Sequence, residues 1–404
     1  MGEPANARAV PVPPDVGDTD ALARLIAALG PGRARYIGGW VRDTLLGLAP
    51  QDLDVATTLP PQAARAAAEA ARLQVWTSTS GLAHGTIGVV VGGRTVEVTT
   101  LRRDVATNGR HAEVAFTDDW REDAARRDFT INALSADPAS GAVHDHFGGL
   151  PDLARGHVRF IGDPERRIAE DHLRVLRFFR FHARFGGDAP DAEGYAACVA
   201  RARDLMALSR ERIAGELLKL LAVADPLNAV RAMLAGGILT PVLPEIVSAD
   251  RLAALLASER EAGIAPDGLR RLAALLPAGA EIPVRIASRL RLSKANQLRL
   301  ITDAAPVGEQ DAVASAYLHG VPATVDRLLL GGRPSDARRL AGSEPPRFPL
   351  RGGMLIARGL APGPQVAATL KRIEARWMGS GFPDDAALEA IVSEELACQA
   401  RETR

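Results

Sequence analysis

The sequence has no net charge and almost no lysine. Its 49 basic residues balance 49 acidic residues, and only Lys219, Lys294 and Lys371 are lysines. This balance excludes the uniformly basic field that marks many nucleic-acid binders, so any contact with nucleic acid has to be a local patch. The preference for arginine, together with abundant alanine, we attribute to genome composition rather than to function.

Cysteines and long apolar runs are also scarce. Cys198 and Cys398 are the only two cysteines, which indicates a reducing compartment and no zinc site. No signal segment opens the sequence, and no apolar run reaches the length of a membrane span. We therefore expect a cytoplasmic protein without a membrane partner, and we infer no obligate protein partner.

With 404 residues, the sequence exceeds one ordinary domain. Residues 1–18 are rich in Pro and Gly and lack periodicity, which predicts a loose tail. Residues 19–150 mix strand and helix patterns and predict a small mixed sheet, in which Gly92 and Gly93 join two strands as a hairpin. From about Arg166 strand signals stop and helical periodicity takes over.

Two glycines follow a short apolar stretch that predicts a strand. Gly38 and Gly39 come directly before a helix that we expect to begin near Trp40. Because glycine has no Cβ and the first helical N–H groups are unpaired, a polyanion can approach the backbone closely at such a turn. Arg42, on the first helical turn, adds a guanidinium that suits phosphate oxygens.

A pair of acids follows about ten residues later. Asp52 and Asp54 are two apart on a predicted strand, so they share a face with Cα atoms roughly 6.6 Å apart. Two carboxylates that converge on one point suit a hard divalent cation, which proteins hold with one or two carboxylates and the substrate phosphates. By itself an Asp-x-Asp sequence also occurs in ordinary solvated turns.

The two motifs together resemble a known signature. Residues 38–43 (Gly-Gly-Trp-Val-Arg-Asp) and 52–54 (Asp-Leu-Asp) are similar to those of the class II tRNA nucleotidyltransferases, which are the CCA-adding enzymes and their poly(A) polymerase relatives. The resemblance implies an α+β fold, with a polymerase-β-like nucleotidyltransferase head followed by an elongated all-helical neck, body and tail. It also implies Mg²⁺ held by Asp52 and Asp54.

Glu97 lies on the last predicted strand of the sheet, between Val96 and Val98. A solvated position on the hairpin explains it as well as a site does. The family places a third carboxylate on a strand next to the first pair, so the resemblance implies a catalytic role for Glu97 beside Asp52 and Asp54.

Residues 103–125 are highly charged and poor in apolar side chains, which predicts a long loop. This segment matches the mobile loop of the family. His111 within it is expected to be an incidental surface histidine.

Residues 126–134 (Arg-Arg-Asp-Phe-Thr-Ile-Asn-Ala-Leu) match the second motif of the family. Asp128 is expected to cap the helix that follows. The resemblance further implies that Asp128 contacts the ribose and that Arg127 contacts the nucleotide.

Residues 170–180 carry Asp171, Arg174, Arg177 and Arg180 at every third position, which predicts one flank of a helix. An ion-paired, solvated face is the common fate of such a run. Cytosine and adenine, however, both present an amino donor beside a ring-nitrogen acceptor, which a carboxylate and a guanidinium would read together. The run resembles the base-reading motif of the family, with Asp171 and Arg174 on the base and Arg177 and Arg180 toward the triphosphate.

A later motif and a basic run complete the pattern. Residues 208–217 match a further family motif, which we interpret as structural, with Ser209 as a helix cap. Residues 284–300 contain no acid and would suit tRNA phosphates, although a solvated helix is nearly as good an explanation. The basic residues that we assign to RNA there are Arg285, Arg289, Arg291 and Lys294.

These patterns predict a head at residues 19–150, base-reading neck helices at 151–225 and a tRNA-binding body and tail at 226–404. The predicted activity is template-independent addition of CCA to the 3′ end of tRNA from CTP and ATP. One alternative is a poly(A) polymerase or an enzyme that adds only part of CCA. A nucleotide-binding module without chemistry is a remote alternative, because all three carboxylates are present.

Overall fold

The computed structural model describes residues 10, 18–50, 52–107, 112–277, 279, 281–304 and 312–402. The chain divides into two compact units, Met1–Val247 and Ser248–Arg404, and each is described by itself. The boundaries predicted near residues 150 and 225 both lie inside the first unit, and they stay predictions.

The first unit begins with a seven-stranded mixed sheet of order β3-β4-β5-β2-β1-β8-β9. Its strands are β1 Ala34–Ile37, β2 Asp54–Thr57, β3 Val75–Trp76, β4 Thr86–Val91, β5 Arg94–Thr100, β8 Ser135–Ala136 and β9 Val143–His144. The strand expected before Gly38 and the two strands expected on either side of Gly92 and Gly93 are confirmed. Gly92 and Gly93 form the two-residue β4–β5 turn, and both have the positive φ that such a tight hairpin requires.

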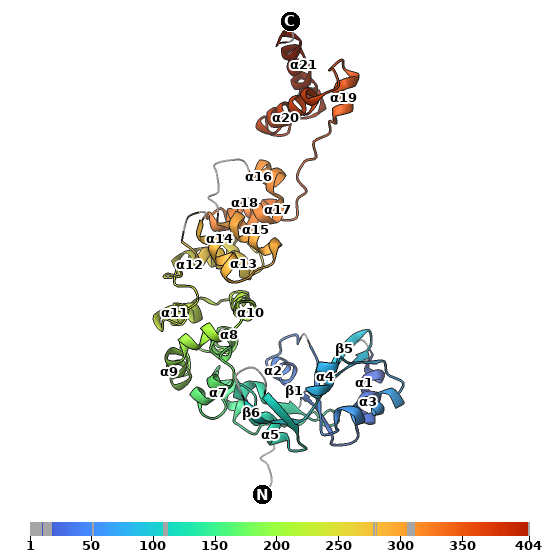
Figure 1. Ribbon diagram of the computed structural model, residues 1–404, viewed down its shortest axis with the longest axis vertical. Coiled ribbons are helices and arrows are strands. Elements are labelled where there is room, and N and C mark those ends of the chain that lie inside the picture. Colours follow the sequence, from blue (N-terminus) through green and yellow to red (C-terminus); the bar gives the residue numbers. More distant parts are fainter. Residues whose placement is uncertain are drawn as a thin grey trace. The chain divides into compact units, whose positions relative to one another are not determined.

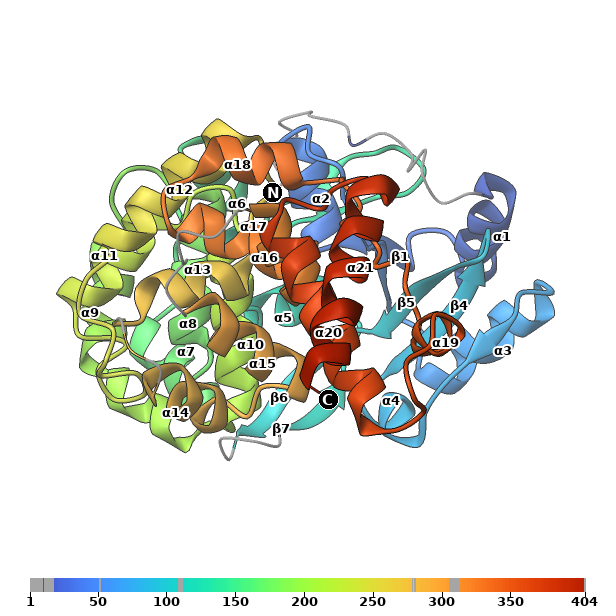
Figure 2. The ribbon, with the colours of Figure 1, turned by 90° about the horizontal axis from the view of Figure 1, so that it is seen from above.

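Helices cover this sheet. They are α1 Thr19–Leu29, α2 Gly39–Leu45, α3 Pro61–Ala70 and α4 Thr79–Ala83. In α1, the side chain of Asp18 accepts a hydrogen bond from Ala21 N–H, and the buried Leu22, Leu25 and Leu29 recur at helical spacing. Helix α1 packs against α3, which in turn packs against β4 and β5 (Figures 1 and 2).

The prediction of a long loop at residues 103–125 is wrong for most of that range. Strands β6 Arg102–Thr107 and β7 Ala112–Phe116 form a separate two-stranded sheet, and α5 Trp120–Ala125 follows. A two-stranded sheet has no buried face of its own to require apolar alternation, so the charged sequence concealed the strands. Residues 108–111, including His111, lie outside the described residues.

The rest of the first unit is mainly helical. They are the 3₁₀ helix η1 Thr130–Asn132, α6 Gly149–Ala154, α7 Pro164–Glu170, α8 Arg174–Phe185, α9 Ala192–Ala200, the 3₁₀ helix η2 Ala202–Ala207, α10 Arg210–Leu221 and α11 Leu227–Ala235. Helix α8 packs against α10 and α11. No described helix of the protein is long and apolar enough to cross a membrane.

A cluster of phenylalanines joins the sheet-side segments to α8. Phe129 and Phe160 are fully buried, with ring centroids 4.9 Å apart, and Phe178 of α8 stacks on Phe160 at 5.5 Å. Phe181 also contacts Phe129, at 5.2 Å. Aromatic residues make up only 4% of the sequence, yet these four phenylalanines gather in one place. Their packing holds residues 126–132 against helix α8.

The second unit is helical throughout its described residues. Its helices are α12 Asp250–Ala262, α13 Gly268–Leu275, α14 Glu281–Arg289, α15 Lys294–Asp303, α16 Ala312–His319, α17 Val321–Leu330, α18 Pro334–Leu340, α19 Gly352–Ala357, α20 Pro364–Gly379 and α21 Asp385–Glu402. Trp377 of α20 belongs to an apolar core with Leu355, Leu388 and Val392.

Buried ion pairs link helices α12, α13, α15 and α17. Arg270 donates to Glu259 at 2.8 Å and to Asp326 at 2.9 Å, and Arg299 lies 2.6 Å from Asp326. Asp303 is buried beside them, but neither of its carboxylate oxygens has a hydrogen-bond partner in the described part of the chain. Burial, with Asp326 nearby, raises the pKa of Asp303 to about 8.

Replacing Asp303 with asparagine should therefore stabilise the chain in a pH-dependent way. The folded carboxyl keeps its proton up to about pH 8, whereas an unfolded aspartate loses it near pH 4. The folded state thus binds more protons between these values, and its stability falls as the pH rises through this window. The difference in the free energy of unfolding between Asp303→Asn and the unmodified chain should therefore grow, in favour of the variant, by about 1–4 kcal/mol between pH 5 and pH 8.

Urea unfolding of the full chain at both pH values measures this advantage. Asp385→Asn, which changes an exposed aspartate at the start of α21, is the control and should show no such growth. An advantage of Asp303→Asn that is equal at both pH values would contradict the prediction.

Candidate nucleotidyl-transfer site

The glycine turn lies between β1 and α2. Strand β1 ends at Ile37, and Gly38 has φ 65° and ψ −127°, a conformation that residues with a Cβ rarely adopt. A Cβ on Gly38 would also lie 3.3 Å from Nη1 of Arg127. Helix α2 begins at Gly39, as expected from the sequence. Gly38 is therefore required for both its backbone angle and the close approach of Arg127.

Two of the three predicted carboxylates, Asp54 and Glu97, lie on neighbouring parallel strands, whereas Asp52 precedes β2 and, contrary to expectation, does not lie on the same strand as Asp54. Asp54 at the start of β2 pairs in register with Glu97 of β5, so both side chains lie on the same face of the sheet. Burial, together with Glu97 and Asp52, raises the pKa of Asp54 to about 6, although Arg127 opposes this shift. Within the described residues, none of the three carboxylates accepts a hydrogen bond or forms an ion pair.

This uncompensated negative charge fits a divalent cation, and carboxylate oxygens are the ligands that Mg²⁺ prefers. Asp52 and Asp54 could hold it. Among the described residues, no three His, Cys, Asp or Glu side chains form a complete metal-binding group. Water and substrate phosphates would have to supply the remaining ligands.

A cavity of about 670 Å³ opens beside Asp52 and Asp54. This volume lies in the usual range for small-molecule sites. Its walls include every predicted nucleotide-binding residue: Gly38, Gly39, Arg42, Arg127, Asp128, Asp171, Arg174, Arg177 and Arg180. Glu97 is not among the lining residues. Seven arginines and four aspartates line the cavity, so its formal charge is positive although the whole chain is neutral.

Arg42 lies deeper than expected for a phosphate ligand. Its side chain is buried, donates to Asp43 at 2.8 Å and to Asn132, and stacks over the ring of Phe185 at 4.1 Å. Burial lowers the pKa of Arg42, while Asp43 opposes that shift. Arg42 thus supports the wall of the cavity, and its contact with phosphate stays a prediction.

Asp128 does not cap a helix, contrary to expectation. The 3₁₀ helix η1 that follows has Phe129 at its N-cap position, without a side-chain hydrogen bond. Asp128 is buried and instead accepts hydrogen bonds from Phe129 N–H and Asn132 Nδ2, and from Arg177 Nε at 2.8 Å. Burial alone would raise the pKa of Asp128, but Arg177 and these hydrogen bonds hold it below its ordinary value.

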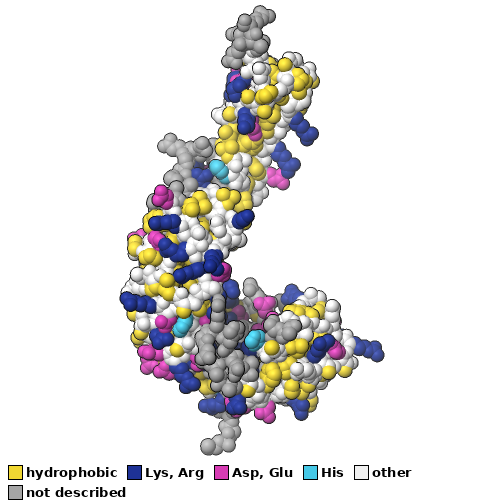
Figure 3. Space-filling model, viewed as in Figure 1, with side chains coloured by type: hydrophobic (Ala, Val, Ile, Leu, Met, Phe, Trp, Pro, Cys, Tyr) yellow, Lys and Arg dark blue, Asp and Glu magenta, His cyan; other side chains and the backbone are white. Residues whose placement is uncertain are grey.

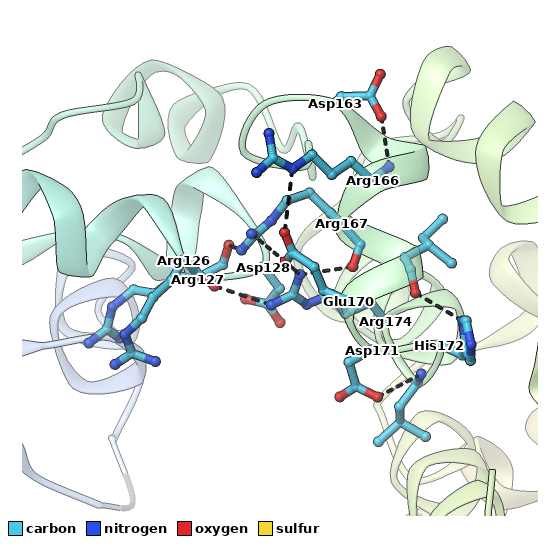
Figure 4. A network of polar contacts seen from close by, with 12 residues as sticks. Arg126, Arg127, Asp128, Asp163, Arg166, Arg167, Glu170, Asp171, His172 and Arg174 are labelled. Atoms are coloured by element: carbon cyan, nitrogen blue, oxygen red, sulfur yellow. Dashed lines mark hydrogen bonds and ion pairs between the residues drawn. The ribbon is translucent and has the colours of Figure 1, made fainter. Parts of the chain in front are cut away.

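Asp171 lies before α8 rather than on its flank. Helix α7 ends at Glu170, Asp171 has an extended backbone with φ −151°, and α8 begins at Arg174. The regular spacing of charges in the sequence therefore spans a helix break. Arg174 reaches back from α8 and donates to Glu170 at 2.6 Å and to the carbonyl oxygen of Arg126 at 3.1 Å (Figure 4).

Three polar residues of the cavity wall were not predicted: Arg126, Asn132 and Arg212. Arg212 of α10 donates to both carboxylate oxygens of Asp171, at 3.0 and 2.9 Å. Glu216, one turn further along α10, pairs with Arg180. Ser209 occupies the N-cap position of α10, but its side chain makes no capping hydrogen bond. The Arg-x-x-x-Glu spacing at residues 212–216 places the two charged side chains on one face of a helix, and this was the sequence signal that could have indicated their role in the cavity wall.

The predicted RNA-binding residues belong to the second unit. Arg285, Arg291 and Lys294 are exposed and Arg289 is half-buried, on α14, α15 and the turn between them. Arg299 of the same run instead forms ion pairs with Asp267 and Asp326. On the face drawn in Figure 3, basic side chains are dispersed among acidic and apolar ones.

Known proteins resemble this chain over most of its length. Residues 34–159 match the model of the poly A polymerase head domain, and residues 190–250 match that of the probable RNA and SrmB-binding site of polymerase A. The CCA tRNA nucleotidyltransferase 1, mitochondrial, of Mus musculus is 34% identical over 366 residues, which cover 86% of this chain and 83% of the mouse protein. This chain belongs to the family of CCA-adding enzymes and poly(A) polymerases.

Other members of the family support the assignment. A CCA-adding enzyme of Lacticaseibacillus paracasei is 37% identical over 215 residues, 52% of each chain. The crystal structure of the Bacillus stearothermophilus CCA-adding enzyme in complex with CTP matches with TM-score 0.63 at 25% identity, and covers 95% of this chain and 99% of that one. The Thermotoga maritima CCA-adding enzyme complexed with tRNA_CCA, at 21% identity, shares the fold with TM-score 0.66 over 94% and 95% of the two chains.

Gly38→Ala and Gly39→Ala form a matched pair that tests the turn in this family member. Gly38→Ala should cost on the order of 1–3 kcal/mol in stability, because its φ is positive and its Cβ crowds Arg127. A Cβ on Gly39 meets only Arg42 Nη2, at an ordinary 3.5 Å. Thermal unfolding measures the stability of the two variants, and calorimetry measures their nucleotide binding. Equal losses in the two variants would contradict the assigned role of Gly38.

Proposed function

We propose that this protein completes the 3′ end of tRNA by adding C, C and A from CTP and ATP, without a nucleic-acid template. One observation carries the proposal: a single positive cavity brings together the glycine turn, the acid pair Asp52 and Asp54, and the pair Asp171 and Arg174. The relatives named as CCA-adding enzymes, and the solved structures of relatives in complex with CTP and with tRNA, support these substrates.

The reaction is an attack by the terminal tRNA hydroxyl on the α-phosphate of the nucleotide, from which pyrophosphate leaves. Asp52 and Asp54 would hold Mg²⁺, which supplies charge neutralisation and a lower pKa for the hydroxyl when bound. Glu97, in register with Asp54, would help to orient the hydroxyl. Arg127, which lies over Gly38, would bind the phosphates.

Base choice would fall to Asp171 and Arg174, at the junction of α7 and α8. A carboxylate accepts from the amino group of cytosine or adenine, and a guanidinium donates to the adjacent ring nitrogen. Uracil and guanine present the reverse order, which places a carbonyl oxygen against the carboxylate. Arg177 and Arg180 line the same cavity one and two turns further along α8, where they would face the triphosphate.

The alternatives from the sequence lose support. A relative that matches most of the chain is named as an enzyme, which argues against a nucleotide-binding module without chemistry. The relatives are named for CCA addition, which favours CCA addition over poly(A) addition. A cytoplasmic location stays a prediction, because the names of the mouse and human relatives place those proteins in mitochondria.

The proposed activity is tested with purified protein and a tRNA that lacks CCA. CTP alone should extend the tRNA by two nucleotides, and CTP with ATP should extend it by three. ATP alone should add nothing to this substrate. A long tail made from ATP alone would identify a poly(A) polymerase instead.

Asp52→Ala or Asp54→Ala should abolish transfer, by at least about a thousandfold in kcat, because the proposed metal site is lost. Glu97→Ala should lose less activity, since water can replace a third carboxylate. Binding of tRNA should be nearly unchanged in all three variants. Single-turnover incorporation and gel-shift titration measure these effects, and Glu69→Ala, an exposed acid of α3, is the control. Full turnover in either aspartate variant would overturn the assignment.

Neutralising Arg285, Arg289 and Arg291 together should weaken tRNA binding. The KM for tRNA should rise, and the slope of log K against log salt should fall by about two to three charges. A matched triple variant of exposed arginines in the first unit, Arg24, Arg65 and Arg94, is the control. An unchanged slope would assign the first three arginines to a solvated helix face.

A further inference from the structure

Asp171 is anchored by a residue of another helix. Its Oδ1 accepts from Leu173 N–H at 3.1 Å, and Arg212 Nη2 of α10 contacts Oδ1 at 3.0 Å and Oδ2 at 2.9 Å. Both side chains line the cavity. Because Asp171 lies in the extended break between α7 and α8, no helix of its own fixes its direction.

Helix α10 is a rigid base for this contact. Its buried residues Ile213 and Leu217 form an apolar face beside the two charged positions, and the helix packs directly against α8. Glu216, four residues after Arg212, holds Arg180 of α8. Arg212 thus projects from a helix whose position relative to α8 is set by both apolar packing and a second ion pair.

Arg212 uses only one of its nitrogens for Asp171. Within the described residues, its Nε and Nη1 make no further hydrogen bond. A residue that served only to fasten the 171–173 turn would not need to line the cavity, as Arg212 does beside Asp171.

We propose that Arg212 is a positioning residue that fixes the Asp171 carboxylate toward the incoming base and so sets the rejection of UTP and GTP. This inference rests on the proposed function. With both oxygens held, the carboxylate can accept from an amino group and repel a carbonyl oxygen at one defined place. Without Arg212 the carboxylate can turn to solvent, so the amino group loses its acceptor and the carbonyl oxygen is no longer repelled.

Arg212→Ala should therefore change selectivity and not only rate. The kcat/KM for CTP and for ATP should fall about tenfold to a hundredfold, the effect of one charge-assisted hydrogen bond. The values for UTP and GTP should fall less or rise, so the ratio of correct to incorrect nucleotide should drop at least about tenfold. Arg212→Lys should recover part of the ratio, because an ammonium restores the charge but not the planar guanidinium.

The test is single-nucleotide incorporation of all four nucleotides, each alone, by the full-length chain. Arg210→Ala is the matched control, since Arg210 lies two residues before Arg212 on α10 and, among the described residues, donates hydrogen bonds only to Met206 Sδ. In an Asp171→Ala background, Arg212→Ala should have no further effect on the ratio. If Arg212→Ala does not fold, the ratio of Arg212→Lys and its dependence on Asp171 decide the matter.

An equal loss for all four nucleotides, with an unchanged ratio in both Arg212 variants, would overturn the inference and leave Arg212 a structural residue. Failure of the proposed function is separate from this outcome. It would be visible in the unmodified chain, as no incorporation or as equal use of all four nucleotides.

Discussion

The ion pair between the buried Asp128 and the partly exposed Arg177 is the contact on which the site depends. It joins the segment after α5 to helix α8, and Asn132 extends it to Arg42 beneath the glycine turn. A carboxylate buried this completely requires its partner, because breaking such a pair typically costs about 3–5 kcal/mol. The strand side and the helix side of the cavity are therefore fixed relative to one another before any substrate arrives.

The orientation of the Asn132 amide follows from its two neighbours. Its oxygen accepts from Arg42 and its nitrogen donates to Asp128, and the opposite orientation would set a donor against a donor and an acceptor against a carboxylate. The ring of Phe185 packs against Arg42 at 4.1 Å, and the ring of Phe181 packs against Arg42 and Arg177, at 5.3 Å from each. Polar contacts specify the geometry here, and apolar packing makes it stable.

Much of this was predictable from the sequence, and the failures have physical causes. The sequence pointed to Gly38, Asp52 and Asp54 as neighbours of one cavity because a glycine turn and two closely spaced acids are local patterns, although β2 begins only at Asp54. The β6–β7 hairpin was missed because its sequence is charged and shows no regular apolar alternation, and Asp171 was placed on a helix because its spacing matched one. Arg212 was interpreted as structural, since its contact with Asp171 spans 41 residues and depends on how α10 packs.

The arginines of the cavity are engaged by the protein and yet keep the capacity to bind a substrate. Arg174 has five N–H donors, and it uses three of them on Glu170 and the carbonyl oxygens of Arg167 and Arg126. Nε and one hydrogen of Nη2 remain, enough to donate to a ring nitrogen without breaking a bond. In the proposed role, Arg174 would read a base without breaking these contacts, which would lower the entropic cost of selecting it. The neutral chain achieves a positive, ordered cavity because its acids hold the arginines in place without using all of their donors.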